Sequence, residues 1–508
     1  MVRLLFRKRW LGWCLGWFLC LAGPPPAAQP LDLSPAAQRF RASIDTLFQN
    51  HCADGVMAGV KMVSMETHTT LFEKNPGTLF VPASNMKLVT TATALHRWGP
   101  DFRFHTRIYS PGKIRGRTLH GDVYLKGFGD PFLVTEQMWL LVNELRQLPL
   151  DRIEGDVYVD DSYFTGGLKV ATWDPSEGPE AYLAPLGALS FNFNTVAVHV
   201  APGKRPGDRP VVVIDPDIPY LRLANSAVTT RGGRRGRLIV NRHRRDGGDV
   251  VTVSGSVPLD KARKTHYLNI TDPTTYTGQV FMKFLRQAGV EVTGVLRQGL
   301  VPEGSALLLD HESPPLADIL QGLNKYSNNF IAEQILRTLA AREFGPPGTT
   351  ENGVRLLRDY LAGLGFPRDS FTVVDGSGLS RQNRLSPEQL VAVLMDAHED
   401  LSIFPEFISA LAIMGLDGSV DERMTAVPGS QRIRAKTGTL NHVSALSGYF
   451  QSSDGEVFAF SILLNGLRCS NGRAHQLQDA IMTEALRFSR RVGGASSKEA
   501  VSPEEINP

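Results

Sequence analysis

The chain has few cysteines and few long apolar runs. Among its 508 residues there are four cysteines, Cys14, Cys20, Cys52 and Cys469. It contains no Cys-x-x-Cys pair and no His-Glu-x-x-His run, so the sequence predicts no metal site and no cofactor. After the N-terminal segment no apolar run approaches the roughly 20 residues that a membrane-spanning helix needs. This excludes a multi-span membrane protein.

Net charge is also small, with 54 Lys and Arg against 51 Asp and Glu. The excess lies in residues 1–28, which hold four basic residues and no acidic one and leave 50 against 51 in the rest. A nearly neutral body argues against a nucleic-acid-binding protein. What the chain does have is apolar content, since 42% of its residues are hydrophobic. Its length predicts about two to four domains at roughly 100–200 residues each.

Residues 1–28 have the order of a secretory signal peptide. Arg7-Lys8-Arg9 precede an apolar run over residues 10–22, and the small pair Ala27-Ala28 follows. We therefore predict an exported, periplasmic protein that is soluble or held peripherally at the membrane; an uncleaved anchor is the alternative. In an oxidising compartment Cys52 and Cys469 either form a disulfide that closes a long loop or remain two separate buried thiols.

Hydrophobic periodicity divides the chain into three stretches. Up to residue 98 it predicts a helix at 33–50, a strand hairpin at 56–72 and a helix at 82–98. Residues 101–304 are rich in Gly, Pro and short β-type runs, with little helical pattern before 276–289. Further elements are predicted as helices at 317–325, 329–342, 353–363 and 387–399, strands at 444–451 and 457–464, and a helix at 474–490. These patterns predict a helix-and-strand domain interrupted by a β-rich insertion.

The first of three reactive motifs is Ser84-Asn85-Met86-Lys87. It places a hydroxyl and an amine on one face of the helix predicted at 82–98, because residues three apart share a helix face. Ser84 lies in the first turn, where unpaired N–H groups and the helix dipole favour the negative charge of a nucleophile. Lys87 can take its proton once burial lowers the pKa of the amine. A surface Ser and Lys that merely fit the pattern are the alternative.

The second motif, Ser327-Asn328-Asn329, lies between two predicted helices. In a functional interpretation Ser327 passes a proton to the leaving amine and the Asn329 amide holds a substrate carbonyl. The alternative is a helix N-cap, a position that Ser and Asn commonly fill.

The third motif, Lys436-Thr437-Gly438-Thr439, lies in a predicted strand whose glycine permits a close approach of the backbone. Such a strand can pair with an extended peptide, while Lys436 and Thr437 bind its carboxylate. The N–H groups of Thr439 and Ser84 can then form an oxyanion hole. The alternative is an edge strand protected by a lysine.

Together the three motifs, in this order, resemble those of D-alanyl-D-alanine carboxypeptidases and endopeptidases of the penicillin-binding protein 4 type, the low-molecular-mass class C penicillin-binding proteins. The resemblance extends over nearly the whole chain after the signal segment. It includes the runs Val81-Pro82-Ala83-Ser84, Gly99-Pro100-Asp101-Phe102-Arg103, Gly127-Phe128-Gly129-Asp130-Pro131 and Asp375-Gly376-Ser377-Gly378-Leu379-Ser380-Arg381.

The resemblance implies a role for each motif residue. Ser84 becomes the acylated nucleophile and Lys87 its proton acceptor. The remaining catalytic and substrate-binding residues are Ser327, Asn329, Lys436, Thr437, Gly438 and Thr439. Asp160 matches a position that binds the free amino group of a diaminopimelate side chain in relatives, with its neighbour Asp161 as the rival.

The resemblance also implies an α+β fold of the serine β-lactamase/D,D-peptidase type. This fold is an antiparallel sheet flanked by helices, with a helical subdomain, and here it is interrupted by β-rich inserted domains. The expected division is a signal peptide at 1–28, a first peptidase part at 29–100, an inserted domain at 101–165, a nested β-rich domain at 166–258, the rest of the inserted domain at 259–304, a second peptidase part at 305–492 and a disordered tail at 493–508.

We therefore expect a serine D,D-carboxypeptidase and endopeptidase that acts, through an acyl-enzyme at Ser84, on peptidoglycan stem peptides ending in D-Ala-D-Ala and on their cross-links. Penicillin and other β-lactam antibiotics are expected to acylate and inhibit it. A β-lactamase-like hydrolase and a catalytically silent wall-binding protein are the alternatives. The arginine-rich stretch from Arg231 to Arg245 is either a weak docking site for membrane or anionic wall polymer, or a solvated hairpin.

Overall fold

The structure is a computed structural model that describes residues 29–50, 56–173, 178–233 and 236–491. The signal peptide predicted at 1–28, Cys52 and the tail predicted at 493–508 lie outside these residues. Cys469 is disulfide-bonded, and because Cys52 is not described, the pairing of these two cysteines stays a prediction. Within the described ranges, no helix combines the length and apolar character needed to cross a membrane.

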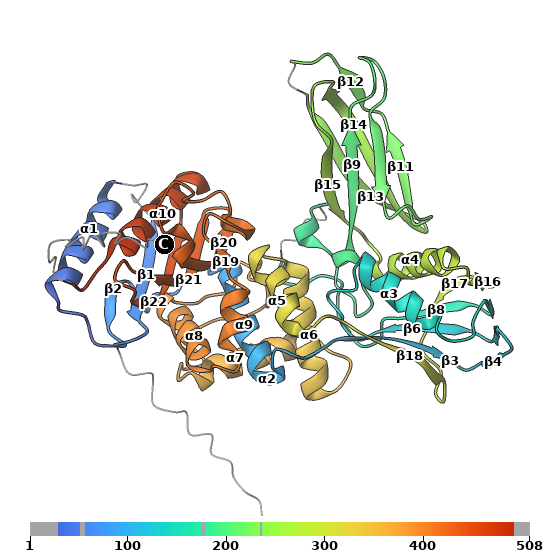
Figure 1. The fold of residues 1–508 in the computed structure, drawn as a ribbon, viewed down its shortest axis with the longest axis horizontal. Helices are drawn as coiled ribbons and strands as arrows, with labels where there is room; N and C mark the ends of the chain where they lie inside the picture. The colour runs from blue at the N-terminus through green and yellow to red at the C-terminus, as the bar shows by residue number, and fades with distance from the viewer. Residues whose placement is uncertain (1–28, 51–55, 174–177, 234–235, 492–508) are drawn as a thin grey trace, which may run out of the picture.

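A six-stranded antiparallel sheet forms the centre of the peptidase part, in the order β19-β20-β21-β22-β1-β2 (Figure 1). Its strands are β1 (Met57–Ser64), β2 (Thr70–Lys74), β19 (Ala412–Ile413), β20 (Ile433–Leu440), β21 (Val443–Gln451) and β22 (Val457–Asn465). β1 pairs with β22 over its whole length, so segments from both ends of the chain complete one sheet. Both strands are buried nearly throughout because helices cover both faces of the sheet.

Alternating residues of the strands face two separate apolar cores. On one face, Phe460 and Ile462 of β22 pack with side chains of α1 (Pro35–Asn50) and α10 (Asn471–Arg487). On the other, Ala459 and Leu463 belong to the apolar cluster formed with the other helices of the peptidase part. These are α2 (Met86–Trp98), α5 (Leu316–Lys325), α6 (Asn329–Phe344), α7 (Thr350–Gly363), α8 (Pro387–Glu399) and α9 (Phe404–Ser409). The predicted α+β fold, an antiparallel sheet with a helical subdomain, is confirmed.

A second sheet, of five strands in the order β17-β8-β6-β3-β18, lies beside the helical subdomain. A small four-stranded sheet, β16-β7-β5-β4, accompanies it. The elements of this inserted part are β3 (His105–Ser110), β4 (Lys113–Arg115), β5 (Thr118–His120), β6 (Val123–Gly127), α3 (Thr135–Leu145), β7 (Arg152–Glu154), β8 (Val157–Asp160), α4 (Pro273–Gln287), β16 (Glu291–Val292), β17 (Leu296–Gln298) and β18 (Ala306–Glu312). α3 was not expected from the sequence.

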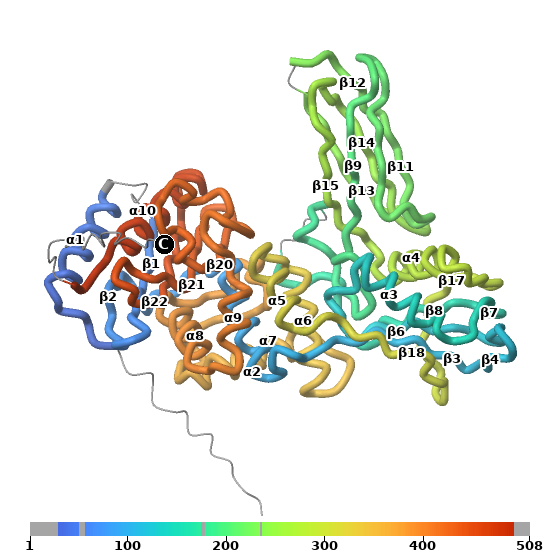
Figure 2. The backbone as a smooth tube through the Cα atoms, viewed as in Figure 1, coloured from blue at the N-terminus to red at the C-terminus, as the bar shows by residue number. Residues whose placement is uncertain are grey.

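A β-rich arm stands away from the rest of the molecule (Figures 1 and 2). Its strands are β9 (Thr195–Ala201), β10 (Val211–Asp215), β11 (Leu221–Asn225), β12 (Val228–Thr230), β13 (Leu238–Arg245), β14 (Gly248–Pro258) and β15 (Lys264–Asn269). They form two sheets, β10-β9-β15 and β11-β14-β12, with β13 paired to β14.

Strand pairing suggests two changes to the expected domain boundaries. β15 pairs with β9 of the arm, so we propose that the nested domain continues to Asn269 rather than ending at residue 258. β18 pairs with β3, so we propose that the inserted domain continues to Glu312 rather than ending at residue 304.

The chain between β8 and β9 returns to the peptidase part. We call residues 163–173 and 178–194 the returning segment. Its Trp173 and Leu183 are buried in the same apolar cluster as Leu88 of α2 and Ile331 of α6. The insertion is therefore packed against the helices that carry the first two motifs.

Candidate active site

Ser84 lies in a single 3-10 turn, Ala83–Asn85, directly before α2 rather than inside it. Ala83 has a φ of 47°, in the left-handed region that a residue with a side chain rarely adopts. The turn packs on Gly378, where an added Cβ would lie 1.8 Å from the Ala83 carbonyl oxygen. Lys87 follows in the first turn of α2, with its Nζ 3.0 Å from Ser84 Oγ. The expected proximity of hydroxyl and amine is present.

Lys87 is buried and held by two further oxygens. Its Nζ donates to Asn329 Oδ1 and to the carbonyl of Ser377, each at 2.7 Å. Burial lowers the pKa of Lys87 to about 7, against the opposing influence of the nearby carboxylates of Asp375 and Glu333. A neutral amine has two N–H groups and one lone pair. With both N–H groups directed to these two oxygens, the lone pair is left for the proton of Ser84.

Ser327 lies on the loop between α5 and α6, in the left-handed region with a φ of 58°. The helix-cap interpretation applies to the middle residue of the motif, because Asn328 Oδ1 accepts the N–H of Ile331 at 3.1 Å. Ser327 and Asn329 are left to line the cleft that contains Ser84.

The third motif lies on β20 and passes close to Ser84. A Cβ at Gly438 would lie 2.9 Å from the Pro82 carbonyl oxygen and 3.0 Å from the Ser84 nitrogen, so only glycine fits easily. Asn85 Nδ2 donates to the Lys436 carbonyl at 2.9 Å and ties the strand to this turn. Among the described residues β19 pairs only with Arg434 and Ala435, so the edge of β20 from Lys436 onward is open on that side.

Lys436 is fully buried, and its Nζ donates to the carbonyl of Thr437 at 2.9 Å. Burial, followed by the charge of Lys87, lowers its pKa well below the ordinary value for lysine. The two amines are therefore close enough to influence one another. Thr437 Oγ1 is 2.6 Å from Ser419 Oγ.

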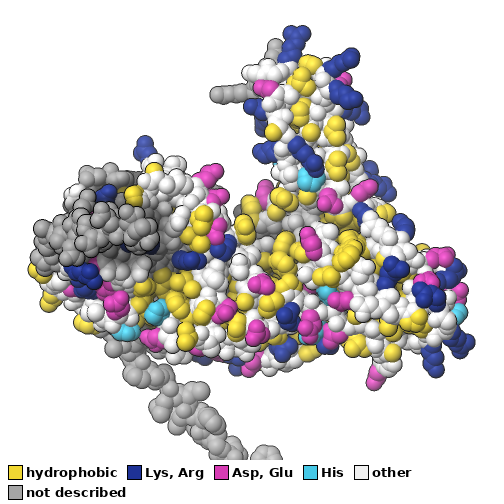
Figure 3. Space-filling model, in the orientation of Figure 1, with side chains coloured by type: hydrophobic (Ala, Val, Ile, Leu, Met, Phe, Trp, Pro, Cys, Tyr) yellow, Lys and Arg dark blue, Asp and Glu magenta, His cyan; other side chains and the backbone are white. Residues whose placement is uncertain are grey.

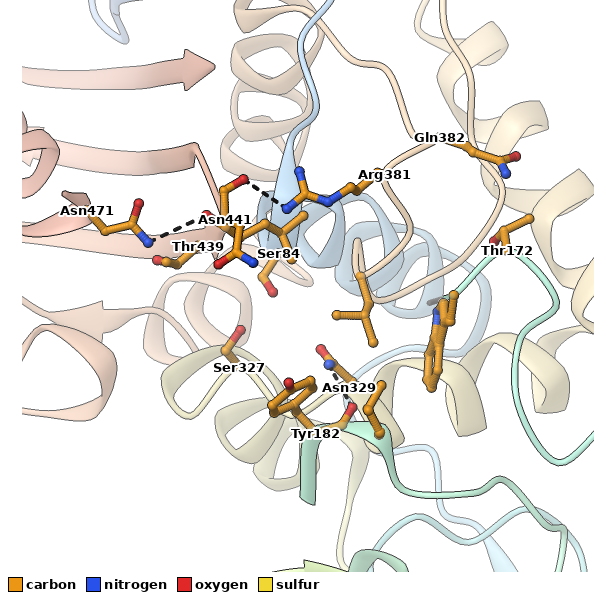
Figure 4. Close-up of a pocket in the computed structure, with 14 residues that line it drawn as sticks. Ser84, Thr172, Tyr182, Ser327, Asn329, Arg381, Gln382, Thr439, Asn441 and Asn471 are labelled. Atoms are coloured by element: carbon orange, nitrogen blue, oxygen red, sulfur yellow. Dashed lines mark hydrogen bonds between the residues drawn. The ribbon is translucent and has the colours of Figure 1, made fainter. Parts of the chain in front are cut away.

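Ser84 opens into a cleft of about 680 Å³ (Figure 4). Thr439 of the third motif also lines it, together with Ser327 and Asn329 of the second. The structure thus brings together three motifs that are far apart in the sequence. The residues that sequence reasoning did not assign to the cleft are Thr172, Trp173, Tyr182, Leu183, Leu379, Arg381, Gln382, Leu440, Asn441 and Asn471.

Three of these additions differ in whether the sequence could have revealed them. Arg381 ends the run Asp375–Arg381 and donates to the Asn441 carbonyl at 2.8 Å across the mouth of the cleft. The run Asp375–Arg381 could have pointed to Arg381 from the sequence. Trp173 and Tyr182 come from the returning segment, which carries no motif that would have singled them out.

Asp160 is not among the residues that line the cleft, and its contact with a substrate amino group stays a prediction. It ends β8 in the inserted sheet, where its carboxylate pairs with Lys126 at 2.9 Å and accepts the N–H of Val301 at 2.9 Å. Its rival Asp161 is also absent from the cleft lining and accepts the N–H of Leu189 at 2.6 Å. Both carboxylates form hydrogen bonds within the insertion.

Residues 40–486 match the D-Ala-D-Ala carboxypeptidase 3 (S13) family. The chain belongs to this family. A D-alanyl-D-alanine carboxypeptidase of Actinomadura sp. (strain R39) is 32% identical over 486 residues, which cover 93% of this chain and 88% of that protein. The D-alanyl-D-alanine carboxypeptidase DacB of Haemophilus influenzae is 25% identical over 424 residues, covering 81% of this chain and 86% of that one.

Solved structures give the same result for the fold. The crystal structure of penicillin binding protein 4 (dacB) from Haemophilus influenzae matches with a TM-score of 0.76 at 24% identity, covering 88% of this chain and 99% of that chain. The same protein complexed with a novel β-lactam matches with a TM-score of 0.71. The present chain is thus a serine-type D-Ala-D-Ala carboxypeptidase of the penicillin-binding protein 4 type, as the motifs predicted.

Proposed function

We propose that Ser84 is the nucleophile of this carboxypeptidase and forms an acyl-enzyme with the penultimate D-Ala of a stem peptide. The observation that carries the proposal is the position of Lys87. Its Nζ lies 3.0 Å from Ser84 Oγ and also donates hydrogen bonds to Asn329 Oδ1 and to the Ser377 carbonyl. Ser84 Oγ attacks the carbonyl carbon as Lys87 accepts its proton. The C–N bond then breaks, and the terminal D-Ala leaves with a proton passed through Ser327.

The open edge of β20 supports the proposed substrate position. An extended peptide can add to such an edge as a further strand. In this position the N–H groups of Ser84 and Thr439 hold the oxyanion of the tetrahedral intermediate. Lys436 and Thr437 stabilise the terminal carboxylate, and Asn329 holds a carbonyl of the stem. Water then hydrolyses the ester of Ser84, with Lys87 again accepting a proton.

We propose that penicillin acylates Ser84 by the same mechanism and that its acyl-enzyme is hydrolysed only slowly. Ser84 opens the lactam ring and the bulky product remains attached, which obstructs the hydrolytic water. The β-lactam complex of the Haemophilus influenzae relative supports this proposal. A slow release also separates the proposal from a β-lactamase-like hydrolase.

We propose endopeptidase activity on cross-links as a second use of the same atoms. The two substrates differ only in the amine that is released when the C–N bond breaks: the amino group of D-Ala in one, and that of a cross-linked side chain in the other. The cleft that contains Ser84 has a volume of about 680 Å³, more than a single amino-acid residue fills.

Hydrolysis of a soluble pentapeptide ending in D-Ala-D-Ala tests the proposal. The wild-type protein is expected to release D-Ala, and Ser84→Ala to lose this activity and its labelling by fluorescent penicillin. Ser110→Ala is the matched control, because Ser110 begins a second Ser-x-x-Lys sequence and ends β3 in the inserted sheet. Equal activity or labelling of the wild type and Ser84→Ala would reject Ser84 as the nucleophile.

We also propose that the protein is exported and that the arm docks on an anionic membrane surface. Residues 195–271 carry 14 Lys and Arg against six acidic residues, whereas the rest of the chain after residue 28 carries 36 against 45. Figure 3 shows Lys and Arg side chains distributed over the arm. Such an excess attracts anionic headgroups.

The far end of the arm combines this charge with apolar side chains. Here the loop 202–210 meets β12, since Gly207 N donates to the Thr229 carbonyl at 2.8 Å. The exposed basic residues at this end are Lys204, Arg205, Arg209, Arg231, Arg237, Lys261, Arg263 and Lys264. Val228 and Leu259 are exposed among them, which favours a bilayer interface over a purely polar polymer.

A further inference from the structure

The returning segment touches two of the groups that hold Lys87. The carbonyl of Tyr182 accepts a hydrogen bond from Asn329 Nδ2 at 3.1 Å. This bond fixes the orientation of the Asn329 amide, so that its oxygen faces Lys87 at 2.7 Å. The insertion therefore determines which end of the amide Lys87 meets.

The second contact is made by Trp173 through a buried carboxylate. Trp173 Nε1 donates to Asp375 Oδ2 at 3.0 Å, and both side chains are buried. Asp375 in turn accepts the N–H of Gly378 and that of Ser380, each at 2.8 Å. Ser380 Oγ also donates to the Thr172 carbonyl at 3.1 Å. The turn 375–380 is thus tied twice to the returning segment.

α6 holds the same turn from the other side. Glu333 Oε1 accepts the N–H of Gly376 at 3.1 Å and that of Ser377 at 2.9 Å. Between these anchors lies the carbonyl of Ser377, one of the two oxygens that accept from Lys87. A shift of the turn would therefore move this oxygen away from the amine.

We propose that Trp173 is a positioning residue for the proton acceptor of the reaction, and that the returning segment of the insertion is in this way a working part of the active site. Trp173 holds Asp375, Asp375 holds the turn, and the turn presents the Ser377 carbonyl to Lys87. With that oxygen and Asn329 in place, the lone pair of the neutral amine is directed at Ser84. The inference rests on the proposed role of Lys87.

Acylation by a β-lactam tests this inference, because it separates binding from chemistry. The dissociation constant of the initial complex and the acylation rate constant are both measured by stopped-flow for the wild type and Trp173→Phe. Phenylalanine keeps an aromatic ring but lacks the N–H donor and the second ring of the indole. We expect an unchanged dissociation constant and an acylation rate constant that falls about 10- to 100-fold, as expected for a small misplacement of a reacting group.

Two further variants complete the design. Trp98→Phe is the matched control, since Trp98 stacks on Phe102 at the far end of α2 and is expected to leave both constants unchanged. Ser380→Ala removes the other tie, to the Thr172 carbonyl, and is expected to slow acylation in the same way. In the double variant the two effects should not add, because both act on one turn.

The outcomes distinguish this inference from the proposed function. A raised dissociation constant with an unchanged acylation rate constant would mean that Trp173 only contacts the ligand, and would overturn the inference. Unchanged constants in both Trp173→Phe and Ser380→Ala would overturn it as well. In either case Ser84 and Lys87 would keep their proposed roles, because Ser84 is tested separately by the labelling of Ser84→Ala and Lys87 by the pH dependence of acylation. Thermal unfolding of each variant shows whether a slower rate reflects loss of the fold.

Discussion

Lys87 is the residue whose protonation decides whether Ser84 can be activated. Its amine can accept a proton only when it is neutral, and burial lowers its pKa to about 7. Glu333 lies in the same buried region, and burial together with the charge of Asp375 raises the pKa of its carboxyl to about 8. Both groups change charge near neutral pH, so the active site is expected to be sensitive to pH there.

The second-order rate constant for acylation is expected to rise with pH through about 7 and then to level. Below this pH Lys87 is an ammonium without a lone pair, so the rate should fall about tenfold for each unit of pH. The measurement is the rate of labelling by fluorescent penicillin from acidic to mildly alkaline buffer. Lys113→Ala is the control, because Lys113 belongs to the second Ser-x-x-Lys sequence and is exposed on β4. A rate that stays constant through neutral pH would contradict the role of Lys87.

Asn328 shows how a motif residue can serve the helix rather than the reaction. Its side chain caps α6, which carries both Asn329 and Glu333. Asn328→Ala is expected to destabilise the fold by about 1 kcal/mol, the usual cost of a lost N-cap. Asn328→Asp keeps an oxygen acceptor and is expected to retain both stability and acylation. The midpoint of thermal unfolding measures the first effect, and an unchanged midpoint in Asn328→Ala would show that the cap contributes nothing.

Most helices and strands of the peptidase part could be predicted from local patterns. α8 begins with Pro387 after Ser386, whose side chain forms a capping box with Gln389, and its bounds match the prediction. α3 was missed, although Met138, Leu141 and Val142 are buried at helical spacing. Trp139 is 57% exposed and Leu140 39% exposed on the same helix, so apolar residues lie on both sides and obscure the amphipathic pattern.

At the scale of the whole molecule, the sequence predicted which motifs meet but not what else lines the cleft. Ser84, Ser327 and Thr439 could be found because each lies in a short pattern tied to a chemistry. Trp173 could not, because its role depends on a chain path that leaves the peptidase part and returns. The position of Asp160 outside the cleft lining could not be predicted for a related reason: a match in local sequence says nothing about which surface a strand end faces.

The charge of the arm makes a prediction at the same scale. The protein is expected to co-sediment at low salt with vesicles that contain phosphatidylglycerol, and not with vesicles of phosphatidylcholine alone, which lack the anionic headgroups. Raising the salt concentration should also weaken the binding, because salt screens the attraction between the charges. The double variant Arg231→Glu/Lys261→Glu should lower this binding without changing hydrolysis of a soluble peptide. The control, Lys113→Glu/Arg115→Glu, reverses two exposed charges on β4.

The other outcomes would reject the membrane as the partner of the arm. Equal binding to both kinds of vesicle, or equal loss in the β4 control, would show that the far end of the arm is not the contact. Binding to isolated wall polymer without binding to vesicles would assign the arm to the wall instead.

The most direct test of the account is to locate the penicilloyl group on the protein. The purified protein is incubated with benzylpenicillin, digested, and the modified peptide sequenced by mass spectrometry. We predict a single adduct, on Ser84, that persists through the digestion and is absent from Ser84→Ala. An adduct on Ser327 or any other residue, or rapid release of penicilloic acid with no adduct, would contradict the account.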